Sequence, residues 1–180
     1  ETEKIAQIID KSDFQHDYVS GIKATEEQFK LSAPKSNIIH IATHGFFLPD
    51  TDVFTSEEKE DEKNRATSIF RGGNNAIGIS NFVVNKNPLM RSGLVFAGAN
   101  DVWIKDEGNE IEDGVVTAQE VTNMDLRKTS MAVLSACETG LCDIKETEGV
   151  YGLQRSLKMA GVKYIIMSLW QVPDAETVEF

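Results

Sequence analysis

MAVLSACETG, the stretch from Met131 to Gly140, is the part of the chain from which the fold can be worked out. Its first four residues form a short apolar run, which is typical of a strand buried on both faces. The run stops at Ser135, so Cys137 is expected at the carboxyl end of that strand, the edge of an open α/β sheet where ligands and catalytic groups collect. Taken alone, a cysteine is more often a buried thiol of the core, because free cysteine is among the most buried residue types.

A second strand of the same design comes earlier in the chain. Residues Ile38 to Ala42 are mostly apolar and lead into Thr43, His44 and Gly45. His40 and His44 fall on one face of such a strand by its period of two. We expect His40, inside the strand, to face the core or a helix, and His44, at its end, to have a functional role.

The remaining elements predict an α/β protein, because strands alternate with helices or long connections. We therefore expect a mostly parallel central sheet covered by helices on both faces, with His44, Cys137 and Asp174 at the carboxyl ends of its strands. The other predicted strands cover 94–97 and 163–169, and the predicted helices lie near 5–9, after N-caps at Thr25 and Thr117, and from Glu148 to Ala160, where Gly161 stops the last one.

Charge and length exclude several classes of protein. The chain has 180 residues and a net charge of −11, concentrated in acidic stretches at 50–63 and 101–113. We expect a single domain over 1–180 with an acidic insertion around 50–75. The chain has no basic patch, so nucleic acid is not expected as a direct partner. It also has no apolar run of the roughly 20 residues that span a bilayer, so no membrane partner is expected.

Cysteine usage and the chain ends give further expectations. Cys137 and Cys142 match neither a disulfide framework nor a zinc pattern, which favours a reducing compartment, the cytoplasm, and no metal or other cofactor. The chain begins at Glu1 instead of methionine and stops one turn into an expected helix, so we expect truncation at one or both ends.

A histidine beside Cys137 would give its thiol a chemical use. A thiol with a pKa near 8.5 is only a few per cent thiolate at neutral pH. A neighbouring imidazole raises that fraction by accepting the proton or by stabilising the thiolate. His44 and Cys137 are 93 residues apart in the sequence, so only the fold can bring them together. Neighbouring parallel strands would do so.

Several sequence blocks together resemble the CHAT domain, which belongs to the caspase and separase group of cysteine peptidases. The similarity covers nearly the whole chain except the acidic insertion and the extreme N-terminus. It implies a caspase-like three-layer sandwich. The blocks are IHIATHGFF at 39–47, PLMRSGLVFAGAN at 88–100, DGVVTAQEV at 113–121, VLSACETG at 133–140 and EGVYGLQRSLKMAGVKYIIMSLWQVPDAET at 148–177.

The resemblance implies a His/Cys dyad. Cys137 matches the family nucleophile, and His44 matches the family histidine that protonates the leaving amine and then activates water. The backbone N–H groups of Gly45 and Cys137 would form the oxyanion hole.

The resemblance also indicates where substrate specificity would lie. Asp174 matches an acidic residue on the loop that shapes the S1 pocket of related enzymes, where it would favour a basic P1 residue. It could equally be the N-cap of the helix that follows. Glu138 is a second candidate pocket carboxylate, although Glu138 to Gly140 mainly predict the turn that presents the thiol. Ser135 is interpreted as part of that turn, and Cys142 as a bystander.

These observations predict a cysteine endopeptidase that acts on a protein substrate in bacterial signalling or defence. The resemblance implies control by another domain, such as a TPR array, in the same chain or in a partner. Two alternatives stay open at this point. One is a catalytically silent, caspase-like interaction module, and the other is a small-molecule thiol hydrolase.

Overall fold

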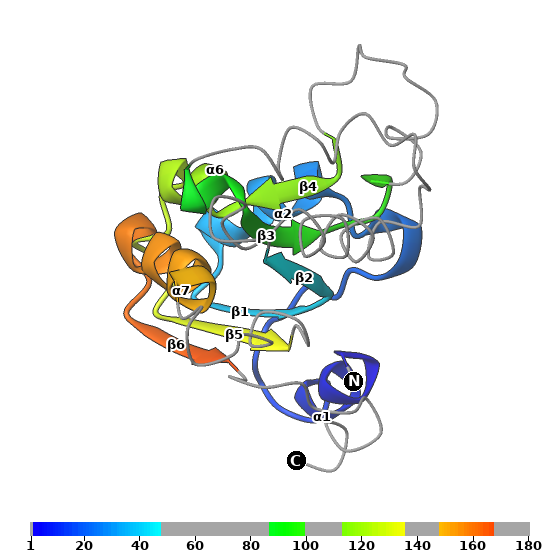
Figure 1. The fold of residues 1–180 in the computed structure, drawn as a ribbon. Helices are drawn as coiled ribbons and strands as arrows, with labels where there is room; N and C mark the ends of the chain where they lie inside the picture. Colours follow the sequence, from blue (N-terminus) through cyan, green and yellow to red (C-terminus); the bar gives the residue numbers. More distant parts are fainter. Residues whose placement is uncertain (1, 48–86, 100–112, 136–147, 168–180) are drawn as a thin grey trace.

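The computed structural model describes residues 2–47, 87–99, 113–135 and 148–167, and the statements below refer to these residues (Figure 1). The elements occur in the order α1 (Thr2–Ile9), η1 (Gly21–Lys23), α2 (Glu26–Ser32), η2 (Ala33–Lys35), β1 (Ile38–Ala42), β2 (His44–Phe47), η5 (Pro88–Met90), β3 (Ser92–Val95), β4 (Val115–Thr117), α6 (Ala118–Asn123), β5 (Met131–Ser135), α7 (Glu148–Ala160) and β6 (Tyr164–Met167).

The strands β1, β5 and β6 form a parallel sheet in that spatial order. Ile38 lies opposite Met131 and Ala42 opposite Ser135, while Met131 in turn lies opposite Tyr164. The central strand of this sheet is β5, whose carboxyl end leads towards Cys137 in the sequence. The prediction of parallel apolar strands at these three places is confirmed.

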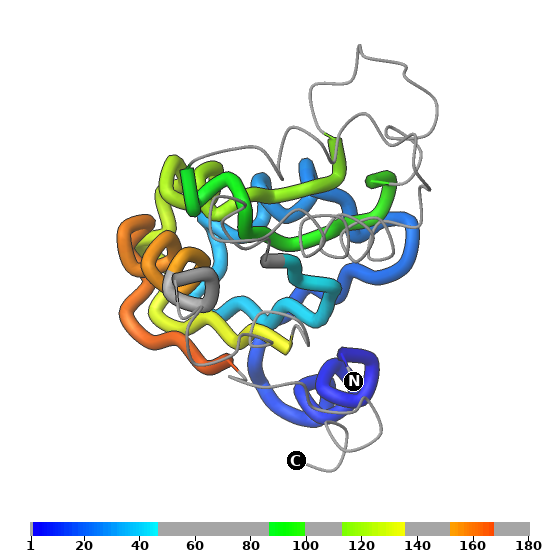
Figure 2. The backbone as a smooth tube through the Cα atoms, in the orientation of Figure 1, coloured from blue at the N-terminus to red at the C-terminus, as the bar shows by residue number. Residues whose placement is uncertain are grey.

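A second sheet, antiparallel, is made of β2, β3 and β4. The chain bends at Thr43, so that β2 leaves the parallel sheet and runs back against β3, as the tube in Figure 2 shows. The hydroxyl of Thr43 donates a hydrogen bond to the carbonyl of Val95, which fixes this bend to β3. The strand expected at 94–97 is β3, and its register pairs it with β2 and β4 in this antiparallel sheet.

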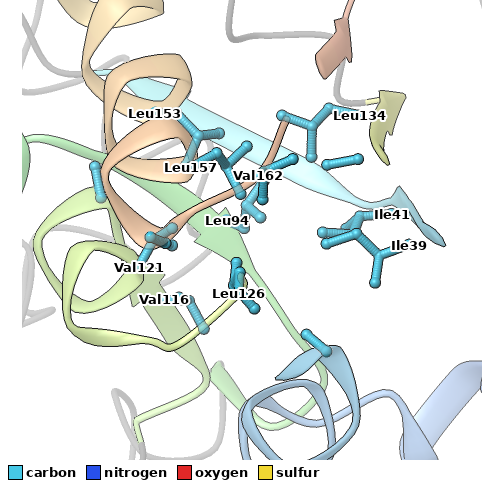
Figure 3. Close-up of a cluster of buried hydrophobic side chains, with 14 residues drawn as sticks. Ile39, Ile41, Leu94, Val116, Val121, Leu126, Leu134, Leu153, Leu157 and Val162 are labelled. Carbon is cyan, nitrogen blue, oxygen red and sulfur yellow. The ribbon is translucent and has the colours of Figure 1, made fainter. Parts of the chain in front are cut away.

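The hydrophobic core lies between the two sheets and the helices α6 and α7 (Figure 3). The parallel sheet contributes alternate residues of β1 and β5 to it, as the period of two requires. These inward-facing residues are Ile39, Ile41, Ala132 and Leu134, and the other elements contribute Leu94, Val116, Val121, Leu126, Leu153, Leu157 and Val162.

The opposite face of the parallel sheet, which we call the outer face, is only partly covered in the described part of the chain. Ile38 is 56% exposed, Tyr164 68% and Ile166 55%. The prediction that the apolar strands are buried on both faces is therefore wrong for these residues. Figure 1 shows α1 on this side of the sheet, but α1 has no buried residue. An apolar run in the sequence indicates that a strand is buried, but it does not show which elements pack against each of its faces.

The ends of the helices follow their local sequence signals. Thr117 and Glu120 form the complete capping box that opens α6, because the Thr117 side chain accepts from the Glu120 N–H and the Glu120 carboxylate accepts from the Thr117 N–H. At α2 the expected N-cap forms at Thr25, whose side chain accepts from the Gln28 N–H, while the Gln28 side-chain amide donates to Ser32.

Helix α7 ends as its glycine predicts. Gly161 has φ +112°, its N–H donates to the Lys158 carbonyl, and the N–H of Val162 donates to that of Leu157. These two bonds satisfy carbonyls that a helix end leaves without intrahelical partners. The described residues thus establish a mixed α/β fold with a small parallel sheet. They do not confirm the full three-layer sandwich that the resemblance implies.

Candidate active site

The register of the parallel sheet aligns the two chain segments that carry the predicted dyad. From Ile38 opposite Met131 to Ala42 opposite Ser135, β1 and β5 pair with a constant offset of 93 residues. His44 and Cys137 are separated in the sequence by the same 93 residues. Each therefore follows the last paired residue of its strand by two positions, and two residues span at most about 7 Å of chain.

His44 is the first residue of β2 and lies opposite Val95 of β3. Its side chain is exposed, so its imidazole is accessible to solvent and to a substrate. Gly45, the predicted oxyanion-hole residue, is buried and lies opposite Leu94. His44 follows the end of β1 by two residues, as the sequence predicts, and the bend at Thr43 also makes it the first residue of the antiparallel sheet.

The strand that holds His44 is braced from the far side of its sheet. Val95, opposite His44, also pairs with Val115 of β4. The N–H of Val115 donates to the Asp113 carboxylate at 2.9 Å, and the N–H of Gly114 donates to Oε2 of Glu26 at 2.8 Å. His44 is therefore connected to helix α2 in two steps. Strand pairing joins His44 to β4 through Val95, and the hydrogen bond from Gly114 to Glu26 joins the residue before β4 to α2.

The charged side chains around Glu26 form ion pairs with one another. Glu26 is only 2% exposed, and its Oε1 lies 2.6 Å from Nζ of Lys30. Lys30 also bonds Oε1 of Glu120 at 2.9 Å. Burial raises the pKa of the Asp113 carboxyl above its ordinary value, and the negative charge of Glu120 raises it further, while the hydrogen bond from Val115 and the charge of Lys30 oppose the shift. This cluster holds β4, α2 and α6 together.

A polar contact that the sequence did not predict lies on the outer face. Nε2 of His40 is 3.2 Å from Oγ of Ser135, the last residue of β5. The sequence predicts that His40 faces the core or a helix, and it interprets Ser135 as part of a turn. Both residues instead end up half-buried on the outer face, where they meet across two strands. The common separation of 93 residues is the signal that could have revealed the contact, because it puts His40 opposite Val133, which is two residues from Ser135 and on the same face of the strand.

The other predicted site residues, Cys137, Glu138 and Asp174, lie outside the described residues, as does the acidic insertion around 50–75. Among the residues that the structure describes, no group of three or more His, Cys, Asp or Glu side chains is arranged to hold a metal ion. Within the same residues, no helix has the length and apolar character that crossing a membrane requires.

Comparison with protein families gives one result. The family described as CHAT domain matches residues 1–180, the whole chain. No curated protein and no solved structure matches the chain.

Proposed function

The chain belongs to the CHAT domain family, a caspase-like family, and from this premise we propose that it is a cysteine endopeptidase with Cys137 as nucleophile and His44 as general acid and base. The observation that carries the proposal is the common offset of 93 residues, because a dyad needs two side chains close together and each of these residues follows a pair of adjacent strand ends by two positions. The exposure of His44 supports it as well, since a general acid must reach its substrate.

The proposed reaction has two steps. The Cys137 thiolate attacks the scissile carbonyl carbon, and the His44 imidazolium gives its proton to the leaving amine, so that the C–N bond breaks and a thioester forms. The neutral imidazole then takes a proton from water as the water attacks the thioester, so that the C–S bond breaks and the acid product is released, with the thiolate and the imidazolium restored. The backbone N–H groups of Gly45 and Cys137 are proposed to stabilise the oxyanion of each tetrahedral intermediate.

Covalent labelling tests the dyad directly. A peptidyl acyloxymethyl ketone with Arg at P1 is expected to add once to the chain, on Cys137, as measured by intact mass and peptide mapping. Cys137→Ala should abolish the adduct. His44→Ala should slow its formation by about 100-fold or more, which is the range of general acid and base contributions.

The chain offers a matched control for each variant. Cys142→Ala removes the other cysteine and His16→Ala a histidine outside the sheets, and both should label within about twofold of the wild-type rate. An adduct on Cys142, or wild-type labelling in His44→Ala, would contradict the mechanism. No labelling at all, even with a regulatory partner present, would favour the silent interaction module. Turnover of small thioesters without peptide cleavage would favour the thiol hydrolase.

For specificity, we propose that Asp174 favours a basic P1 residue, with Glu138 as a second candidate carboxylate. Asp174→Asn separates the pocket role from the N-cap role, because Asn caps helices about as well as Asp but carries no charge. A loss of preference for Arg over Leu at P1 supports the pocket role, and an unchanged preference assigns Asp174 to the cap. We further propose that the domain acts in bacterial signalling or defence under the control of a partner domain such as a TPR array.

A further inference from the structure

The contact between His40 and Ser135 joins the two strands that lead to the proposed dyad. His40 belongs to β1 and Ser135 to β5, and the distance from Nε2 to Oγ is 3.2 Å. The bond is diagonal, because His40 lies opposite Val133 and Ser135 lies opposite Ala42. It therefore reaches from the middle of β1 to the last paired position of β5.

The two side chains lie on the outer face of the sheet. On β1 the core side is occupied by Ile39 and Ile41, and on β5 by Ala132 and Leu134, so the residues between them point the other way. Both His40 and Ser135 are half-buried.

The row of the sheet that contains His40 is otherwise apolar. Val133 lies opposite His40, and Ile166 lies opposite Val133. His40, Val133 and Ser135 are each half-buried, so water competes less well for this hydrogen bond than it would at a fully exposed site. The contact is therefore a specific link between β1 and β5. The other side chains of this row are apolar, so their packing alone would fix the strand ends less precisely.

We propose that His40 is a positioning residue, which holds the end of β5 through Ser135 and so sets the direction in which the chain leaves the sheet towards Cys137. The proposal rests on the proposed function, because it assigns His40 a part in presenting the Cys137 nucleophile. Only Ala136 separates Ser135 from Cys137, so a change at Ser135 is transmitted through two peptide units.

The size of the expected effect follows from the geometry of attack. A nucleophile must be held within about 0.5 Å of its productive position, and an error of about 1 Å can reduce the rate about 100-fold. Losing one link at the strand end should lower the maximal rate of acylation and leave probe affinity unchanged, since His40 is not placed in contact with substrate.

The test uses four variants and a control in the full chain. Ser135→Ala removes the hydroxyl, His40→Leu removes the ring nitrogens at similar volume, and the double variant removes both. His40→Gln is the conservative variant, because its amide reaches about as far as Nε2. Ile166→Thr is the control, since it alters the same face without touching the contact. Each is labelled with the Arg ketone over a range of concentrations, alkylated with iodoacetamide, and unfolded in urea.

We expect Ser135→Ala and His40→Leu each to lower the maximal labelling rate about tenfold or more, with the half-saturating concentration unchanged within twofold. The double variant should be no slower than the slower single variant, because both remove the same link. His40→Gln should recover most of the rate. Alkylation by iodoacetamide, which needs the thiolate but no bound peptide, should change less than twofold, and Ile166→Thr should label like the wild type.

Three results would overturn the positioning role. These are wild-type labelling in both single variants, rate losses that multiply in the double variant, and losses accounted for by the unfolded fraction measured in urea. In each case Cys137 of the wild type still reacts, so the proposed function stands. If Cys137 of the wild type fails to react with the ketone, the proposed function fails and the positioning role fails with it.

Discussion

At the scale of single residues, Glu26 shows how this chain uses a buried charge. Its carboxylate is 2% exposed and contacts both Lys30 and the backbone N–H of Gly114. A buried carboxylate is costly unless it is paired and hydrogen-bonded, and here each oxygen has a partner. The result is a link between α2 and the start of β4, which in turn pairs with the strand opposite His44.

Glu26→Gln is expected to lower the free energy of unfolding by about 1–3 kcal/mol, because a hydrogen bond and an ion pair to a buried group are weakened together. The loss stays below the 3–5 kcal/mol that is typical of a fully broken buried pair, because Lys30 retains its ion pair with Glu120. Urea denaturation measures the change. Glu27→Gln, at the exposed neighbouring position, should change stability by less than about 0.5 kcal/mol.

At the scale of elements, the end of α7 depends on a backbone conformation that L side chains rarely adopt. Besides its positive φ, Gly161 packs against Arg127, and a Cβ there would lie 2.7 Å from Cγ and 2.9 Å from Cα of Arg127. The carbonyl of Ala160 accepts from the N–H of Leu126 at 2.8 Å, so this helix end also anchors the segment before β5.

Gly161→Ala is expected to destabilise the fold by about 2 kcal/mol or more, since strain at a positive φ costs about 1–3 kcal/mol and the contact with the Arg127 backbone adds to it. Gly21→Ala is the matched control. Gly21 also has a positive φ, +59°, but a Cβ there would meet nothing within 4 Å. In thermal unfolding, the midpoint temperature of Gly21→Ala should be well above that of Gly161→Ala. Equal losses of stability in the two variants would show that backbone strain alone, without the contact with Arg127, accounts for the destabilisation.

Local elements were predictable from the sequence where their signals are local. The Thr117 capping box, the Gly161 helix stop and the apolar runs of β1, β5 and β6 each depend on a few adjacent residues. The bend at Thr43 and the pairing of β3 with β2 were not predictable, because they are decided by hydrogen bonds to residues about 50 positions away. For the site, the sequence supplied the residues and their separation, but not the sheet to which His44 belongs.

At the scale of the whole molecule, the two sheets share one continuous segment, Ile38 to Phe47, and enclose a common core. The strand that leads to the proposed nucleophile belongs to the parallel sheet, and the proposed base belongs to the antiparallel sheet. The packing between the two sheets therefore fixes the position of His44 relative to the end of β5. The outer face of the parallel sheet takes no part in that packing.

Two neighbouring residues of β6 test this division into faces. Ile165 packs against the core, whereas Ile166 is 55% exposed on the outer face. Ile165→Thr should lower the free energy of unfolding by about 1–2 kcal/mol through lost apolar burial. Ile166→Thr keeps the same β-branched shape and should change it by less than about 0.5 kcal/mol. A larger loss at Ile166 than at Ile165 would reverse the assignment of the faces.

The pairing of β1 with β5 also has a consequence for how the protein folds. It joins residues 93 apart, whereas β5 and β6 pair across 33. The entropy lost in closing a loop grows with its length, so the longer closure costs about 1 kcal/mol more. Contacts between distant residues also form late, since their closure must be compensated by structure already present. The pairing of the two strands that precede His44 and Cys137 in the sequence is thus expected among the later events of folding, after β5 and β6 have paired.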